Sequence, residues 1–209
     1  MSMEGVLETI RDALVTPHPD PLPQGERGVT FDNTKFVRRR MPMKTKKGTS
    51  KMTLEERVQL LEEVEAIKKM KAEYVLACDE RRWDDAMRYF TAKPVVDFGR
   101  FGRFETWDEV VTFFEVTMPK TIAFTIHRLC NPIIEVKGKT AKGIWYCEIP
   151  STHIPTHKAI LQQGTYEDDY VKEGNQWKHK ILKLTYTYIT DYGEGWVKQQ
   201  WAFPQVPKD

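Results

Sequence analysis

The sequence predicts an α+β fold, a cone-shaped barrel in which one long and two short helices pack on a curved antiparallel or mixed sheet. Apolar residues recur every three or four positions over residues 53–80, and shorter helical patterns follow at 83–90 and 107–116. From residue 121 onward the period changes to alternation broken by short turns, as in strands. Helices followed by strands favour a layer of helices on one face of a sheet. A strongly bent sheet over a long helix would enclose a cavity.

Residues 1–51 differ in composition from the rest, and we expect them to be a separate N-terminal extension. Residues 17–28 read PHPDPLPQGERG, and a basic stretch follows, which predicts disorder. The proline-rich segment also resembles a translated bacterial intergenic repeat, and Met52 opens MTLEER. One expectation is therefore that the native chain starts at Met41, Met43 or Met52, which intact-mass measurement would test. The alternative is a basic, flexible tail.

The folded domain is expected to span residues 52–209 and to open with the long helix. Thr53 is followed three residues later by Glu56, the pattern of a capping box. One face of the helix is apolar and the other carries Lys and Glu, and its end is expected near residues 78–80. The apolar positions are Val58, Leu61, Val64, Ile67, Met70, Tyr74 and Ala77.

Two short helices and one short strand are expected next. The second helix spans residues 83–90, and a strand follows at 95–98. Thr106 is placed to cap a third helix over 107–116, which Pro119 is expected to end. The paired acids Asp84-Asp85 and Asp168-Asp169 are interpreted as turn and surface charges.

The sheet is predicted from β-rich segments separated by turn residues. The strands are expected at 121–128, 133–136, 140–149, 158–171 and 176–190, with turns at 131–132, 137–139 and 173–175 and a loop at 150–155.

Composition excludes several classes of function. A net charge of +2 does not favour binding to nucleic acid or to a membrane, and no apolar run reaches the roughly 18 residues of a spanning helix. The N-terminus has no apolar signal-peptide core, so we expect a cytoplasmic protein. The sequence has no Walker pattern and no GxSxG motif, so nucleotide or acyl chemistry by those routes is not expected. The three cysteines have no CxxC spacing and are expected to be free thiols. His153 and His157 flank Pro155, which forbids the helix that would pair them, so no metal site is expected.

Several segments together resemble the SnoaL-like branch of the nuclear transport factor 2-like superfamily, in particular its bile-acid 7α-dehydratase type. They span nearly all of residues 52–190, and the superfamily hosts dehydratases, isomerases, cyclases and binding modules. The segments are MTLEERV at 52–58, EAIKKMKAEY at 65–74, Asp79 with Trp83-Asp84, MPK at 118–120, His127, Pro132, Gly143 with Trp145-Tyr146, and Gln176-Trp177.

The resemblance, which extends to scytalone dehydratase and lindane dehydrochlorinase, implies a catalytic group. It pairs an acid at the end of the first helix with a sheet histidine, and these positions fall on Asp79 and His127. The helix tyrosine of the family falls on Tyr74. We therefore expect His127 as base, Asp79 as the residue that orients it, and Tyr74 as hydrogen-bond donor. The opposing interpretations are a structural histidine, a helix-end acid and a core tyrosine.

Four further residues are expected to contact substrate, and two of them depart from the family pattern. A second catalytic acid of the bile-acid enzyme falls on Ile149, beside Glu148, and a second pocket tyrosine falls on Phe98. Trp145 lies in the matching motif, and Glu148 either replaces the missing acid or faces solvent.

The resulting hypothesis is a cofactor-independent lyase of the dehydratase type, acting on a polycyclic or aromatic hydroxy-carbonyl compound in a hydrophobic pocket. The alternatives are an isomerase or cyclase of the same fold, or a non-catalytic domain that binds a small ligand. The expected partners are a small hydrophobic substrate and further copies of the chain, as a homotrimer or homodimer. Arg100 and Arg103 either attract an acidic substrate to the pocket mouth or lie in a solvated loop.

Overall fold

A computed structural model describes residues 52–202, so the extension predicted for residues 1–51 lies outside the described residues. The folded part opens with α2 (Leu54–Asp79), whose capping box is formed as expected. The Glu56 amide donates to Thr53 Oγ1 at 3.1 Å, and the Thr53 amide donates to Glu56 Oε2 at 2.8 Å. The apolar stripe predicted for this helix supplies Ile67, Met70 and Tyr74 to the core.

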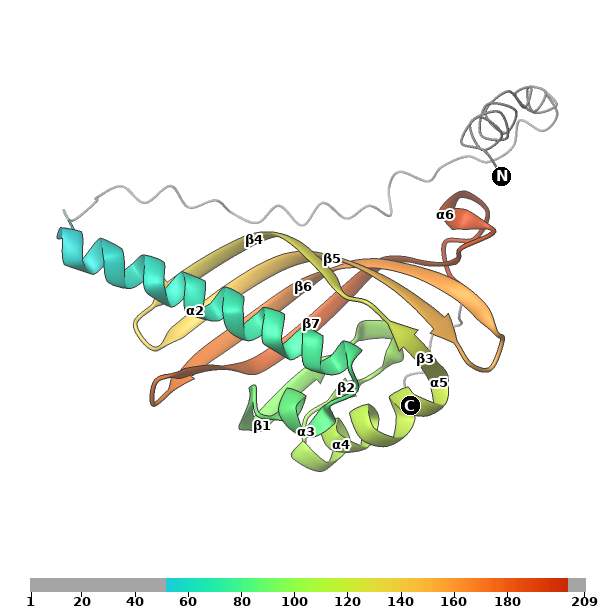
Figure 1. The fold of residues 1–209 in the computed structure, drawn as a ribbon, viewed down its shortest axis with the longest axis horizontal. Coiled ribbons are helices and arrows are strands. Elements are labelled where there is room, and N and C mark those ends of the chain that lie inside the picture. Colours follow the sequence, from blue (N-terminus) through green and yellow to red (C-terminus); the bar gives the residue numbers. More distant parts are fainter. Residues whose placement is uncertain (1–51, 203–209) are drawn as a thin grey trace, which may run out of the picture. The chain divides into compact units, whose positions relative to one another are not determined.

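A single seven-stranded sheet curves beneath α2, and the predicted α+β class is confirmed (Figure 1). The order is β2-β1-β7-β6-β5-β3, with β4 also paired to β5; β1 and β7 run parallel and the other pairs are antiparallel. The strands are β1 (Phe90–Asp97), β2 (Arg103–Phe104), β3 (Ile122–Thr125), β4 (Arg128–Lys137), β5 (Thr140–His153), β6 (Lys158–Glu173) and β7 (Gln176–Asp191).

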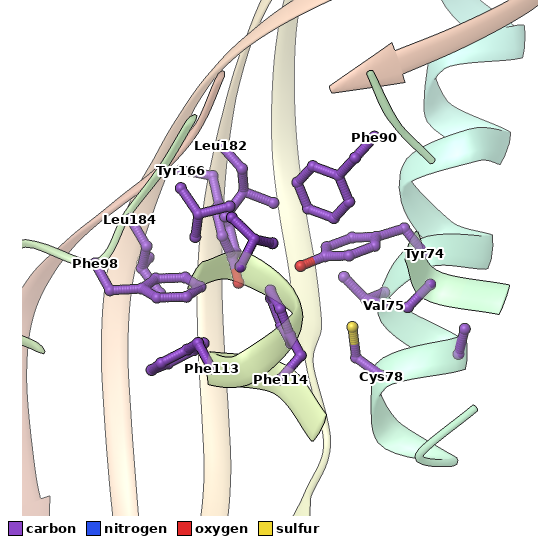
Figure 2. Packing of buried hydrophobic residues seen from close by; sticks show 14 of the residues in the cluster. Tyr74, Val75, Cys78, Phe90, Phe98, Phe113, Phe114, Tyr166, Leu182 and Leu184 are labelled. Atoms are coloured by element: carbon purple, nitrogen blue, oxygen red, sulfur yellow. The ribbon is translucent and has the colours of Figure 1, made fainter. Parts of the chain in front are cut away.

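The core lies between α2 and the face of the sheet that it crosses. Alternate residues of β5 and β6 are buried, so one face of each long strand contributes to the core. Figure 2 shows the central cluster, in which side chains from α2 meet aromatic residues of the short helices and leucines of β7.

The second helix is shorter than predicted and the third is longer. The second, α3 (Trp83–Met87), ends early because Phe90 begins β1, where it pairs with His179. The third begins at α4 (Trp107–Thr112) and continues through η3 (Phe113–Thr117) into α5 (Met118–Thr121). Pro119 does not end this helix: it lies in the first turn of α5, directly after the η3 segment, where proline is tolerated.

The η3 segment is a wide turn of π type, the form that accommodates one residue more than a regular helical turn. Phe113 and Phe114 lie at its start, and both are buried. Adjacent side chains of a regular helix point about 100° apart, and the angle is smaller in a wider turn, which has more residues per turn. The segment therefore supplies two neighbouring aromatic side chains to the same core cluster (Figure 2).

Two predicted breaks in the sheet are absent. Asn131 and Pro132 lie within β4 as a bulge, with Asn131 in the left-handed region at φ 51°, rather than in a turn. The loop expected at 150–155 is mostly strand, because β5 continues to His153, which pairs with Lys158 of β6.

The described chain ends in α6 (Gly195–Lys198) and a short extended segment beside β7. Within residues 52–202, none of the helices combines the length and apolar character that crossing a membrane requires.

Candidate active site

An apolar cavity of about 480 Å³ lies between the C-terminal half of α2, the helices after it and the sheet. Aromatic side chains dominate one part of its wall, and aliphatic residues of β5 and β7 form another. The phenylalanines are Phe98, Phe101, Phe113 and Phe114. A volume of this size accommodates a small organic ligand.

His127 lines this cavity and is in direct contact with Asp79, which is not itself part of the lining. The His127 Nδ1 and Asp79 Oδ1 atoms are 2.6 Å apart, and both side chains are mostly buried, with 16% and 17% of their surfaces exposed. The backbone amide of His127 donates to Asp79 Oδ2 at 2.9 Å, and the Thr125 hydroxyl donates to Oδ1 at 3.1 Å. The carboxylate is therefore fixed by three groups from one short segment of chain.

The local chain geometry explains why the two residues meet. Asp79 is the last residue of α2, and Arg81 follows in the left-handed region at φ 59°, which turns the chain away. The guanidinium of Arg81 donates to the Ile122 carbonyl and ties β3 to the end of the helix. His127 lies in the two-residue break between β3 and β4, so its amide is free of the sheet ladder and can bind Asp79.

The contact fixes how His127 can act. A carboxylate accepts hydrogen bonds, so it favours the tautomer in which Nδ1 carries the proton. In that tautomer Nε2 bears a lone pair, and His127 lines the cavity. The arrangement therefore provides a candidate base whose ring orientation and tautomer are set by Asp79.

Three tyrosines supply hydroxyl groups to the same cavity: Tyr74, Tyr166 and Tyr186. Burial raises the pKa of each phenol above its ordinary value, most strongly for Tyr74 and Tyr166. They remain protonated and can act as hydrogen-bond donors. Figure 2 shows the hydroxyls of Tyr74 and Tyr166 directed into the interior of the cluster from α2 and β6.

Of the four residues predicted to contact substrate, Phe98 and Ile149 line the cavity, whereas Trp145 and Glu148 do not. Because side chains alternate along a strand, Glu148 lies on the opposite face of β5 from Ile149. There it forms an ion pair with Arg128 at 2.5 Å. Trp145 shares the face of Ile149 but is buried away from the cavity, where its indole donates to the Tyr170 hydroxyl at 2.9 Å. Of the two interpretations left open for Glu148, its partly exposed position on the outer face of β5 supports the one in which it faces solvent.

His153 and Gln162 are among the polar residues of the cavity wall that sequence reasoning missed, together with Tyr166 and Tyr186. His153 follows Ile149 and Ser151 on the inward face of β5, so strand alternation over an unbroken β5 would have found it. Its Nδ1 lies 2.7 Å from Thr156 Oγ1, and burial lowers the pKa of its imidazole. Gln162 donates to the Ser151 hydroxyl at 2.9 Å.

Cys78 lies next to Asp79 and also lines the cavity. Burial raises the pKa of this thiol to about 12, so it stays protonated near neutral pH and is a poor nucleophile. Within residues 52–202, no group of three or more His, Cys, Asp or Glu side chains is arranged to hold a metal ion.

A larger groove of about 900 Å³ runs along α2 and α3, on the side away from His127. Charged residues such as Lys69, Glu73 and Arg88 line it, and it contains no histidine. The smaller cavity is the better candidate site because it is apolar and contains the fixed imidazole.

Comparisons with known proteins agree with the fold that carries this site. Among solved structures, a hexachlorocyclohexane dehydrochlorinase, LinA Type2, superposes with a TM-score of 0.61 at 17% identity, covering 65% of this chain and 92% of the other. A protein described as a putative scytalone dehydratase from Novosphingobium aromaticivorans DSM 12444 also gives 0.61, at 23% identity and 65% and 91% coverage. A nuclear transport factor 2-like protein from Salmonella enterica serovar Typhimurium gives 0.55, at 19% identity and 63% and 95% coverage.

Sequence comparison assigns the family. An uncharacterised protein of Mycobacterium tuberculosis is 28% identical over 121 residues, which are 54% of this chain and 77% of that protein. The family model for the SnoaL-like domain matches residues 59–183. The predicted resemblance to the SnoaL-like branch is confirmed, and the chain belongs to the SnoaL-like domain family.

Proposed function

We propose that this protein is a cofactor-independent lyase of the dehydratase type, acting on a polycyclic or aromatic hydroxy-carbonyl compound. The observation that carries the proposal is the 2.6 Å contact between His127 Nδ1 and Asp79 Oδ1 at the wall of an apolar cavity. The dehydrochlorinase and the protein described as a scytalone dehydratase support it, because each name denotes an elimination reaction.

The reaction begins with proton abstraction. His127 Nε2 removes the proton next to the substrate carbonyl, and Asp79 stabilises the imidazolium that forms. The electron pair moves onto the carbonyl oxygen, where a Tyr74 or Tyr166 hydroxyl donates a hydrogen bond to the developing enolate. Collapse of the enolate expels the hydroxyl group, and the imidazolium returns its proton to it. The products are an unsaturated carbonyl compound and water.

One observation favours a second candidate, an isomerase or cyclase that uses the same base. Ile149 occupies the position where the resemblance expects a further acid, and no Asp or Glu is among the described residues of the cavity wall. An isomerase does not need a separate acid for a leaving hydroxyl, since the base that removes the proton can return it to another carbon.

The experiment uses a panel of polycyclic and aromatic hydroxy-ketones in D₂O, with NMR to follow exchange of the α-protons and mass spectrometry to follow products. Loss of water identifies a lyase, and an altered spectrum without a change in the number of atoms identifies an isomerase. His127→Ala is expected to reduce exchange and turnover by about 10²–10⁴-fold. His157→Asn is the matched control, because His157 is exposed in the turn after β5 and Asn tolerates its φ of 52°. Undiminished turnover by His127→Ala would disprove the assignment of the base.

A further inference from the structure

The loop between β1 and β2 sits at the edge of the cavity. It is closed by Phe98, whose amide donates to the Gly102 carbonyl at 2.9 Å, and Gly99 adopts a left-handed φ of 56°. The Phe101 ring lies 5.3 Å from that of Tyr186 on β7, and Phe98 and Phe101 both line the cavity. Arg100, between them, is therefore held at the rim.

The last described segment of the chain packs against Arg100 and pairs with β7. Trp201 pairs with Ile189 of β7 in a parallel bridge, and hydrogen bonds on either side of it fix the segment. The Ile189 amide donates to the Gln200 carbonyl at 2.9 Å, and the Ala202 amide donates to the Ile189 carbonyl at 2.6 Å. The Arg100 guanidinium carbon lies 4.0 Å from the centroid of the Trp201 ring.

This stacked guanidinium has no anionic partner among residues 52–202. Its Nε and Nη1 atoms are buried, and neither has a hydrogen-bond partner in the described part of the chain. Burial without a compensating charge lowers the pKa of Arg100 from its ordinary value. Buried donors of a charged group are costly to leave unsatisfied, so the arrangement favours a ligand that supplies an acceptor.

The neighbouring arginine shows that the loop has acids available. Arg103 donates to Glu105 Oε1 at 2.6 Å and to Asp97 Oδ2 at 3.2 Å, and half of its side-chain surface is exposed. Asp97 also accepts from the Gly99 amide at 2.9 Å. The acids of this loop therefore satisfy Arg103 and the backbone and leave Arg100 unpaired.

We propose that Arg100, held against Trp201, is a carboxylate-binding subsite, and that the ligand is a hydrophobic acid whose apolar body fills the cavity. The guanidinium supplies the charge and the N–H donors that recognise carboxylate oxygens, and the tryptophan ring restricts its orientation. This inference rests on the proposed function only in taking the His127 cavity as the ligand site, and it names the class of substrate as acidic.

The test is a binding measurement that needs no turnover. The probes are 4-(1-pyrenyl)butyrate and 4-(1-pyrenyl)butanol, which share an apolar body and differ in the carboxylate, and pyrene fluorescence reports binding to the full chain. The wild type is expected to bind the acid more tightly than the alcohol. Arg100→Gln is expected to weaken binding of the acid by about 10- to 100-fold and to leave binding of the alcohol unchanged.

Arg103→Gln is the matched control on the same loop, and it should bind both probes as the wild type does. Arg100→Lys keeps the charge without the planar guanidinium, and it should restore part of the preference for the acid. Equal affinity of the wild type for the two probes, or an equal loss of both in Arg100→Gln, would overturn the subsite. A His127→Ala variant that still prefers the acid but lacks turnover separates this inference from the assignment of the base.

Discussion

Two of the polar contacts that helix α2 makes with the rest of the fold differ in their access to the cavity. At its end, Asp79 holds His127 at 2.6 Å, and about a sixth of each side chain is exposed. Nearer its middle, Lys71 forms an ion pair with Asp168 of β6 at 2.8 Å, and neither side chain is exposed at all. We call the contact between Asp79 and His127 the open contact, because His127 lines the cavity and can meet a substrate. We call the ion pair between Lys71 and Asp168 the sealed pair, because both side chains are fully buried.

The two histidines near these contacts differ in the same way. His127 has a carboxylate on Nδ1, whereas neither ring nitrogen of the fully buried His179 has a hydrogen-bond partner within the described residues. The rings of Tyr74, Phe90 and Tyr170 lie 5.0, 5.3 and 5.1 Å from that of His179. Burial, helped by the positive charge of Lys71, lowers the pKa of His179 well below its ordinary value and keeps the imidazole neutral.

A buried charged pair is therefore not by itself a candidate catalytic site. The sealed pair lacks contact with the cavity, and the burial of two charges costs free energy that their attraction only partly returns. Its arrangement is a structural one that holds α2 against β6, as the ion pair between Glu63 and Lys172 at 2.6 Å also does. The open contact combines a fixed tautomer with access to ligand.

The largest expected effect comes from breaking the sealed pair. Asp168→Ala leaves Lys71 charged and unpaired in the core, and it should lower the free energy of unfolding by about 3–5 kcal/mol. Urea denaturation measures this, and the double variant Lys71→Met/Asp168→Leu should recover most of the loss. Asp169→Ala is the control, because this neighbour pairs with Lys142 at the surface and should change stability by about 1 kcal/mol or less. If Asp168→Ala and Asp169→Ala lowered the free energy of unfolding equally, the buried ion pair would contribute no more to stability than the surface pair.

The corresponding change at the open contact should affect activity rather than folding. Asp79→Asn keeps the size of the side chain but removes the charge that stabilises the imidazolium. The rate of α-proton exchange should fall about 10²–10³-fold while the urea midpoint stays within a narrow range of the wild type. Asp84→Asn, an exposed acid at the start of α3, should leave the rate unchanged. A rate equal to that of the wild type in Asp79→Asn would contradict the role of the carboxylate.

The buried imidazole of His179 should make the stability of the fold depend on pH. The pKa of His179 is lowered in the folded state, so its contribution is complete above its unfolded pKa, near 6.5, and is lost as the pH falls below that value. In that window the unfolded state binds one more proton, and the free energy of unfolding falls by about 1.4 kcal/mol per pH unit.

His179→Leu should remove this slope, and His127→Ala should keep it. Asp168 titrates in the opposite sense, because burial raises its pKa, and Tyr74 and Tyr170 stay neutral throughout. The difference between wild type and His179→Leu therefore isolates the histidine. Identical slopes from pH 6.5 to 5 in both proteins would refute the neutral, sealed imidazole.

The smallest effect on stability is expected from removing the Tyr170 hydroxyl, which is hydrogen-bonded to Asp168. Tyr170 donates to Asp168 Oδ2 at 2.8 Å and accepts from the Trp145 indole. Tyr170→Phe should lower the free energy of unfolding by about 1–2 kcal/mol, since both partners lose a buried hydrogen bond. Tyr146→Phe, on the exposed face of β5, should change it by no more than about 0.5 kcal/mol in the same urea titration. A Tyr170→Phe variant as stable as the wild type would show that the network contributes nothing.

The sequence predicted the fold well because the period-3.6 stripe of α2 and the alternation of β5–β7 extend over many residues. It was less successful at single positions. Asn131-Pro132 has the composition of a turn, but asparagine also tolerates the left-handed backbone of a bulge, and pairing on both sides carries the strand through. Local composition cannot distinguish these outcomes, because the partner strand decides between them.

The open contact was predicted and the sealed one was not. Asp79 and His127 were predicted from a resemblance, whereas Asp168 was interpreted with Asp169 as a turn or surface charge, which is wrong for Asp168. Its alternation with Tyr166 and Tyr170 on β6 carried the signal. Lys71 likewise falls on the apolar stripe, between Ile67 and Tyr74. Lys71 and Asp168 each occupy a position that the helical or strand period assigns to the buried face, so applying that period to charged residues as well would have placed both in the core.

The wide turn η3 has a consequence for how this protein can diverge. Removing one residue from it would restore an ordinary helix and rotate α5 by about 100° about the helix axis. Met118 and Thr121, which line the cavity, would turn away from it, while the segment carrying His127 would keep its anchor on Asp79. A change in chain length at one place would thus reshape the cavity wall while the contact between Asp79 and His127 stays intact.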